Sequence, residues 1–125
     1  MAALTLIHAR LLVTILLFFG ALSIWGFFNY LRGSDVTGGY KGALAIGELL
    51  VIAEFLIGLI IFIAGARPFR PSIHILYGIV AVITVPGAFA YTRGRDGRWE
   101  QLIYVTVCLF LCGIVLRSLT TGRPV

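Results

Sequence analysis

Four long apolar segments, joined by short polar connectors, constrain this chain more than any motif does. They cover approximately residues 5–30, 42–65, 72–91 and 100–117 of 125. A helix needs about 20 residues to cross the roughly 30 Å of hydrocarbon in a bilayer, and the segments are close to that length. The sequence therefore predicts an all-α integral membrane protein, a four-helix up-down bundle that forms a single transmembrane domain over residues 1–125.

The composition excludes several function classes. Charged residues make up 12% of the chain, about half the share of a soluble domain. The net charge of +5 comes from residues in connectors and at segment ends, where they meet lipid headgroups, so we expect no nucleic-acid partner. Cys108 and Cys112 lie inside an apolar segment and have no metal-ligand spacing. No catalytic motif is present, and we expect neither catalytic residues, nor a metal site, nor enzymatic activity.

The distribution of basic residues bears on orientation. Four spans place both termini on one side of the membrane, and Lys and Arg are equally frequent on the two sides. The terminal side is purely basic, whereas Asp35, Asp96 and Glu100 accompany the basic residues on the other side. We therefore expect both termini in the cytoplasm.

The two halves of the chain share an order of short motifs. Ile-His opens the first and third segments at His8 and His74, and Tyr-x-Arg-Gly closes them. A glutamate then leads the second and fourth segments, at Glu48 and Glu100, and Gly-x-Arg-Pro or Gly-Arg-Pro follows them. This order indicates two repeated helical hairpins, which would be related by an axis along the membrane normal.

Glu54 is an acidic residue near the middle of the second segment. An ionisable group inside a membrane span is by default a candidate functional residue. It can be a protonated acid that hydrogen-bonds to a neighbouring helix, a partner of Lys or Arg in another subunit, or a site for protons, a cation or a quinone head. No Lys or Arg of this chain lies at its depth, so we expect no ion pair within the chain.

Glu48 precedes Glu54 by six residues on the same segment. Six residues rotate a helix by about 600°, which leaves the two side chains about 120° apart. They therefore do not form one carboxylate pair. We expect Glu48 to reach headgroups or a basic residue of a connector, such as Arg32, Lys41 or Arg93. Both glutamates are candidates for intramembrane polar or partner contacts.

His8 and His74 begin the odd-numbered segments on the same side of the membrane. Odd-numbered helices of an up-down bundle can face each other across the diagonal. Two neutral imidazoles at matched depth could then bind a haem b, or a quinol or proton site could form there. The alternative is that both histidines are interfacial and contact headgroups or loops.

The stretch ARPFRPSIHILYGIVAVITVPGAFAYTRGRDGRWE, residues 66–100, carries an IHxLYG helix start and a YxRGR connector, and together with Gly65 before it forms a Gly-x-Arg-Pro turn. It resembles small four-span accessory membrane subunits of bacterial electron-transfer complexes of the alternative complex III type. The resemblance implies an all-helical, multi-pass subunit of the bacterial inner membrane without a cofactor of its own, which packs against larger membrane subunits and lipids.

These observations lead to one expected function and two alternatives. We expect a structural, accessory subunit of a multi-subunit respiratory or photosynthetic electron-transfer complex. The first alternative is a haem b- or quinone-binding protein that uses His8 and His74. The second is a small transporter with Glu54 on the permeation path.

Overall fold

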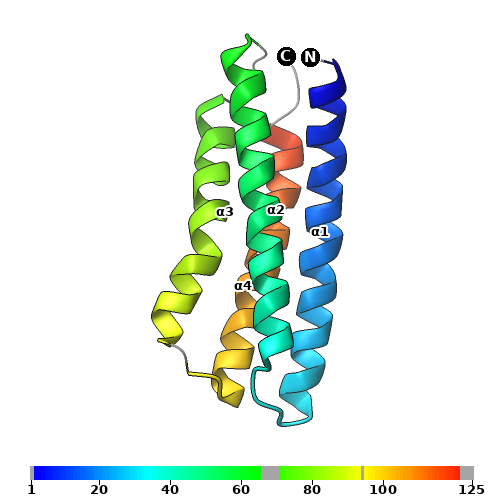
Figure 1. Cartoon of the computed structure of the whole chain (residues 1–125). Coiled ribbons are helices and arrows are strands. Elements are labelled where there is room, and N and C mark those ends of the chain that lie inside the picture. The colour runs from blue at the N-terminus through cyan, green and yellow to red at the C-terminus, as the bar shows by residue number, and fades with distance from the viewer. Residues whose placement is uncertain (1, 66–70, 94, 122–125) are drawn as a thin grey trace.

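The computed structural model describes residues 2–65, 71–93 and 95–121, and it consists of four long helices (Figure 1). They are α1 (Ala2–Leu31), α2 (Gly38–Ile63), α3 (Pro71–Thr92) and α4 (Arg98–Thr121). The described residues contain no strand. The predicted all-α four-helix bundle is therefore confirmed. α1 and α4 continue beyond the predicted segments toward the end of the bundle where the chain starts and finishes.

The connector between α1 and α2 and the connector between α3 and α4 lie at the same end of the bundle, called the connector end below. Local signals in the sequence explain where the helices stop and start there. Gly33, just after α1, has φ +73°, a left-handed conformation that suits glycine and ends the helix. The hydroxyl of Thr37 accepts a hydrogen bond from the Tyr40 N–H and caps the start of α2. Before α4, Glu100 accepts a bond from the Gly97 N–H at 3.0 Å, which is half of a capping box.

The helices form a ring in which each one packs against two neighbours. α1 and α3 both contact α2 and α4, and the diagonal pairs make no backbone contact within the described residues. α1 begins and α4 ends at the same end of the bundle (Figure 1). Side chains on α1 and α3 can therefore meet only across the interior of the bundle.

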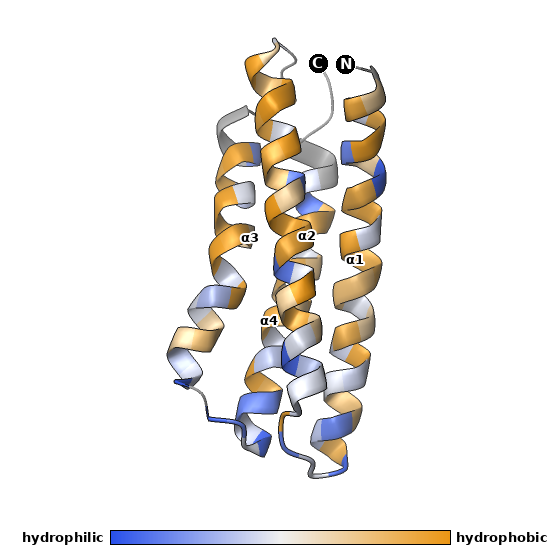
Figure 2. Cartoon of the chain, in the orientation of Figure 1, coloured by the Kyte–Doolittle hydropathy of each residue, from blue (hydrophilic) through white to orange (hydrophobic). Residues whose placement is uncertain are grey.

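The bundle has an apolar interior and an apolar exterior. Ile15, Phe19, Leu44, Val85 and Leu111 are at most 2% exposed and belong to one continuous core. Outside it, Leu17, Ile24 and Ile63 are more than two-thirds exposed. Each helix is long and apolar enough to cross a membrane. Hydrophilic residues collect at the connector end (Figure 2). This pattern belongs to a multi-pass membrane protein, whose outer face meets lipid.

Polar contacts tie the connectors together at that end. Lys41 pairs with Asp96, and the Val36 N–H donates to the Asp96 carbonyl at 2.7 Å. The Arg98 guanidinium lies 4.3 Å from the centre of the Tyr30 ring and donates to the Tyr30 carbonyl at 2.8 Å. These contacts fix the α1–α2 connector against the start of α4.

Candidate functional site

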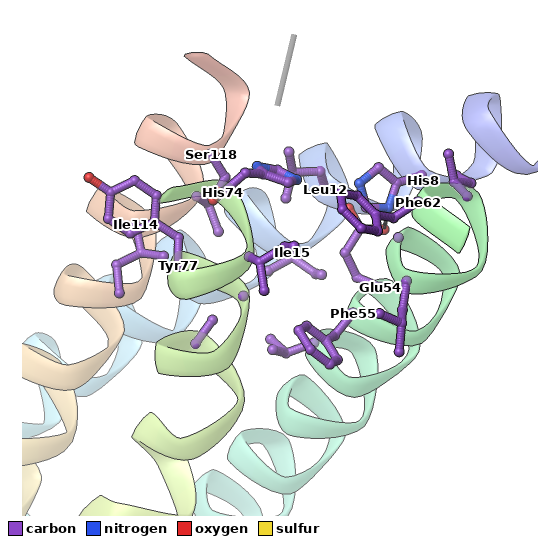
Figure 3. A pocket seen from close by; sticks show the side chains of 18 of the residues that line it. His8, Leu12, Ile15, Glu54, Phe55, Phe62, His74, Tyr77, Ile114 and Ser118 are labelled. Atoms are coloured by element: carbon purple, nitrogen blue, oxygen red, sulfur yellow. Dashed lines mark ion pairs between the residues drawn. The ribbon is translucent and has the colours of Figure 1, made fainter. Parts of the chain in front are cut away.

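The main polar site inside the bundle joins His8 of α1 to Glu54 of α2. The His8 Nδ1 lies 3.1 Å from the Glu54 Oε1 (Figure 3). Glu54 is 7% exposed, so its carboxyl group is well inside the protein. The expectation that Glu54 has no ion-pair partner within the chain considered only Lys and Arg. The structure places the imidazole of His8 beside Glu54 instead, and the two form an ion pair when His8 is protonated.

The positions of the two residues along their helices explain the contact. α1 begins at Ala2, so His8 is six residues inside the helix rather than at its start. Glu54 is nine residues before the end of α2 at Ile63. At 1.5 Å per residue, these depths differ by only about 4–5 Å, which two side chains easily bridge.

His74, on α3, approaches the same place from across the bundle. Its ring centre lies 6.3 Å from that of His8, and the two ring planes are inclined by 72°. Figure 3 shows His8 beside Phe62 and Glu54, and His74 near Ser118. The structure thus brings both candidate histidines and Glu54 into one cluster, although they come from three different helices.

A cavity of about 200 Å³ adjoins this cluster (Figure 3). Its wall is mostly apolar and includes Leu12, Ile15, Val51, Phe55 and Leu111. The polar groups on the wall are those of Thr5, His8, Glu54, His74, Tyr77 and Ser118. An apolar chamber with a few converging polar groups is the usual form of a small-molecule site.

Two glycines make room for the cluster, and the sequence analysis missed both. A Cβ on Gly58 would lie 2.8 Å from the His8 Cε1, and one on Gly78 would lie 2.8 Å from the Phe55 ring. Each glycine follows a site residue by four positions, Glu54 and His74 respectively, and so shares its helix face. That spacing is a signal from which both glycines could have been found.

Glu48 lies apart from this site. It does not line the cavity, and its carboxylate oxygens are buried without a hydrogen-bond partner among the described residues. The basic residues expected near it have other contacts: Lys41 pairs with Asp96, and Arg32 donates to the Asn29 side chain at 2.7 Å. Within the part of the chain that the structure describes, the expected contact of Glu48 with Arg32, Lys41 or Arg93 is therefore absent. The alternative contact with headgroups stays a prediction.

Glu48 and Glu100 also differ in position, which bears on the proposed repeat. Glu48 lies ten residues after the start of α2 at Gly38, whereas Glu100 lies two residues after the start of α4 at Arg98. Glu100 caps its helix, and Glu48 lies well inside α2. The two glutamates are therefore not equivalent in the fold. The arginine–proline motifs of the repeat lie outside the described residues.

The donor set limits what the cluster can bind. Among the described residues, no group of three or more His, Cys, Asp or Glu side chains is arranged to hold a metal ion. A metal bound only by protein side chains usually needs three or four such ligands. Two imidazoles suffice only when another molecule supplies the remaining ligands, as the porphyrin of haem does.

Comparisons with protein-family models, with curated proteins and with solved structures gave no match to this chain. The candidate site therefore rests on the geometry of the chain itself.

Proposed function

We propose that this chain is a membrane-embedded electron-transfer protein that binds a haem b between His8 and His74. The observation that carries the proposal is the 6.3 Å separation of the two ring centres. Imidazole nitrogens bind a transition metal at about 2 Å and lie about 1 Å from their ring centre, so two rings on opposite sides of one metal atom have centres about 6 Å apart.

Two further features support this proposal. The histidines belong to the diagonal helices α1 and α3, so a flat group between them would be enclosed by the bundle. The carboxyl group of Glu54 lies at the Nδ1 of His8, and metal-binding histidines usually donate their second ring N–H to a carboxylate or a carbonyl. A haem iron held here would take the Nε2 of His8, which in this structure lies beside Gly58 of α2.

The size of the cavity sets a condition on haem binding. At about 200 Å³, it is only somewhat larger than the roughly 150 Å³ cavity that holds benzene in another protein. A complete porphyrin is larger, so its binding requires apolar side chains of the wall to move outward. Two imidazoles are a suitable pair of ligands for haem iron, but the cavity in this structure is too small for the porphyrin.

Absorption spectroscopy of the purified protein tests the proposal. We expect a Soret band, either as isolated or after titration with haemin, that is lost in both His8→Ala and His74→Ala. Thr14→Val is the matched control, because Thr14 is an exposed residue of α1 that does not line the cavity. A colourless protein that does not bind haemin would overturn the proposal, as would variants of both histidines with an unchanged spectrum.

The cavity volume favours a second candidate, a quinone-binding protein. A volume of about 200 Å³ accepts a single six-membered ring with a short apolar substituent. His8, Glu54 and His74 would supply hydrogen-bond partners for the oxygens of the ring. Solvent extraction of the purified protein followed by chromatography distinguishes the candidates. A bound quinone without a Soret band, lost in His74→Ala, would support this reading over haem.

The role of accessory subunit in a respiratory or photosynthetic complex stays a prediction. The exposed apolar faces suit lipid and partner helices equally. Co-purification with larger membrane subunits in a mild detergent would support the prediction. Transport through Glu54 likewise stays a prediction, to be tested by ion flux into vesicles with Glu54→Gln.

A further inference from the structure

Glu54 carries an acid group into the bundle that the chain itself does not satisfy. Its side chain is only 9% exposed. Neither of its carboxylate oxygens has a hydrogen-bond partner among the described residues. An ionised carboxylate in apolar surroundings is costly unless it is paired and hydrogen-bonded. Protonation removes the charge but leaves the oxygens without partners. The acid therefore indicates a donor that comes from outside the chain.

His8 places a second unsatisfied atom next to this acid. The Nδ1 of its ring lies 3.1 Å from the Oε1 of Glu54. This nitrogen also has no hydrogen-bond partner within the described part of the chain, so the two atoms lie side by side without a hydrogen bond between them. A ring nitrogen without a proton accepts hydrogen bonds, as a carboxylate oxygen does. One donor group that carries several hydrogens can therefore serve both atoms.

The cavity beside these two atoms sets the size of the molecule that carries the donor. It has a volume of about 200 Å³, and both Glu54 and His8 lie on its wall. An apolar cavity of roughly 150 Å³ holds benzene in another protein, so this one has room for a single ring with a short substituent. The rings of Phe55, Phe62 and Tyr77 are also on the wall and suit an aromatic ligand (Figure 3).

The charged groups of the wall set the sign of the ligand's charge. Among the described residues that line the cavity, Glu54 is the one acid, and none is Lys or Arg. An anionic ligand would therefore meet a like charge. A primary ammonium group is positive and has three N–H donors, which match a carboxylate and a neighbouring imidazole nitrogen. The attraction between opposite charges is strong where water is excluded.

We propose that this cavity binds a small apolar primary amine, whose ammonium group donates to Glu54 and to the Nδ1 of His8 while its hydrocarbon part fills the apolar chamber. This inference goes beyond the proposed function and does not rest on it. The amine fits the cavity as it stands in the structure. Haem would need the same space, so the two molecules are competing occupants.

Titration calorimetry of the full chain in detergent, with benzylamine as the probe, tests the proposal. We expect saturable binding to the wild type. Glu54→Gln keeps the size of the side chain but removes its charge, and it should bind benzylamine at least about tenfold more weakly. Glu48→Gln is the matched control on α2, because Glu48 does not line the cavity. Equal affinity of the wild type and Glu54→Gln would overturn the proposal, as would a wild type that does not bind benzylamine.

Two further probes isolate the contribution of the charge. Benzyl alcohol has the same ring as benzylamine but is neutral, and benzoate is an anion of similar size. We expect both to bind the wild type at least about tenfold more weakly than benzylamine. A neutral probe that binds as tightly as the amine would mean that the cavity recognises only the ring, and the proposal would then be wrong.

A cavity-filling variant tests the place of binding without changing Glu54. Ala81 of α3 is 8% exposed and lines the cavity, so Ala81→Leu adds side-chain atoms to the wall. We expect this variant to bind benzylamine at least about tenfold more weakly, since the free volume is small. Ala90→Leu is the control, because Ala90 is an exposed residue of α3 that does not line the cavity. Circular dichroism checks that the helices of each variant are intact. Unchanged affinity of folded Ala81→Leu would place the amine elsewhere and overturn the proposal.

Haemin distinguishes this inference from the proposed function. A protein that binds benzylamine but no haemin supports the amine site and overturns the haem site. A protein that binds haemin but no benzylamine overturns the amine site alone. Where both bind, haemin should displace benzylamine, and simultaneous binding would show that the amine does not occupy this cavity.

Discussion

Gly58 lies so close to His8 that a single added carbon atom would meet the ring. The Cβ of an alanine at position 58 would come within 2.8 Å of the His8 Cε1. This close approach places the ring of His8 against the backbone of α2 and beside Glu54. The position of the histidine is therefore set by a residue that has no side chain.

The first prediction concerns this approach. Gly58→Ala should force the His8 ring to rotate and break its contact with Glu54, while the bundle itself remains folded. We expect weaker haem binding by at least tenfold, measured by titration with haemin. Gly42→Ala is the control, because a Cβ at Gly42 meets nothing within 4 Å. Equal haem affinity in the two variants would contradict this account of the site.

The second prediction concerns the interface of α1 and α2 nearer the connectors. A Cβ on Gly47 would lie 2.6 Å from the ring of Phe19, which is fully buried. Because the ring has no free space to move into, Gly47→Ala should destabilise the bundle by about 1–3 kcal/mol. Thermal unfolding in detergent measures the effect, with Gly20→Ala as the control at an open position. A Gly47→Ala protein as stable as that control would show that the helices do not approach so closely.

The third prediction concerns a buried hydrogen bond between α3 and α4. The hydroxyls of Thr92 and Tyr104 lie 2.9 Å apart, and both side chains are at most 1% exposed. Tyr104→Phe removes this bond with little change of volume and should cost about 1 kcal/mol. The Thr92 hydroxyl keeps its hydrogen bond to the Phe89 carbonyl, so the free energy of unfolding should fall by little more than this. Equilibrium unfolding of Tyr104→Phe and Thr92→Val, alone and combined, gives the coupling between them, and a coupling of zero would refute the bond.

The fourth prediction concerns the pair formed by Lys41 and Asp96 in the connector region. Both side chains are partly exposed, at 30% and 45%, so salt and water screen their attraction. A double-mutant cycle with Lys41→Ala and Asp96→Ala should give a coupling of about 0.2–1 kcal/mol. The coupling should shrink in high salt. A value well above this range that does not change with salt would mean that the pair is buried in the folded protein.

The four helices could be predicted from the sequence because the length and polarity of a segment decide whether it can cross a bilayer. The pairing of His8 with Glu54 could not be predicted in the same way. α1 is apolar on all sides, so its sequence does not indicate which face turns toward the bundle. The depth of His8 also depends on where α1 begins, and the helix starts before the apolar run does. The sequence predicts the correct end of the bundle for His74. The distance between His74 and His8, however, depends on how all four helices pack.

Glu48 illustrates a different limit. Its distance from the connectors suggested contact with basic residues there, but those residues are engaged by closer groups, such as Asp96 and Asn29. The sequence does not reveal such competition between possible partners. The sequence placed Glu48 six residues inside its segment, whereas α2 begins at Gly38, ten residues before it. This acid has no assigned role in the site.

The order of the helices in the chain has a consequence for biogenesis. His8 and Glu54 both belong to the first hairpin, so their contact can form as soon as α1 and α2 have entered the membrane. His74 arrives with the third helix, and α4 then closes the ring against α1. A nascent chain that consists of its first three helices therefore already contains both histidines and Glu54, before α4 is made.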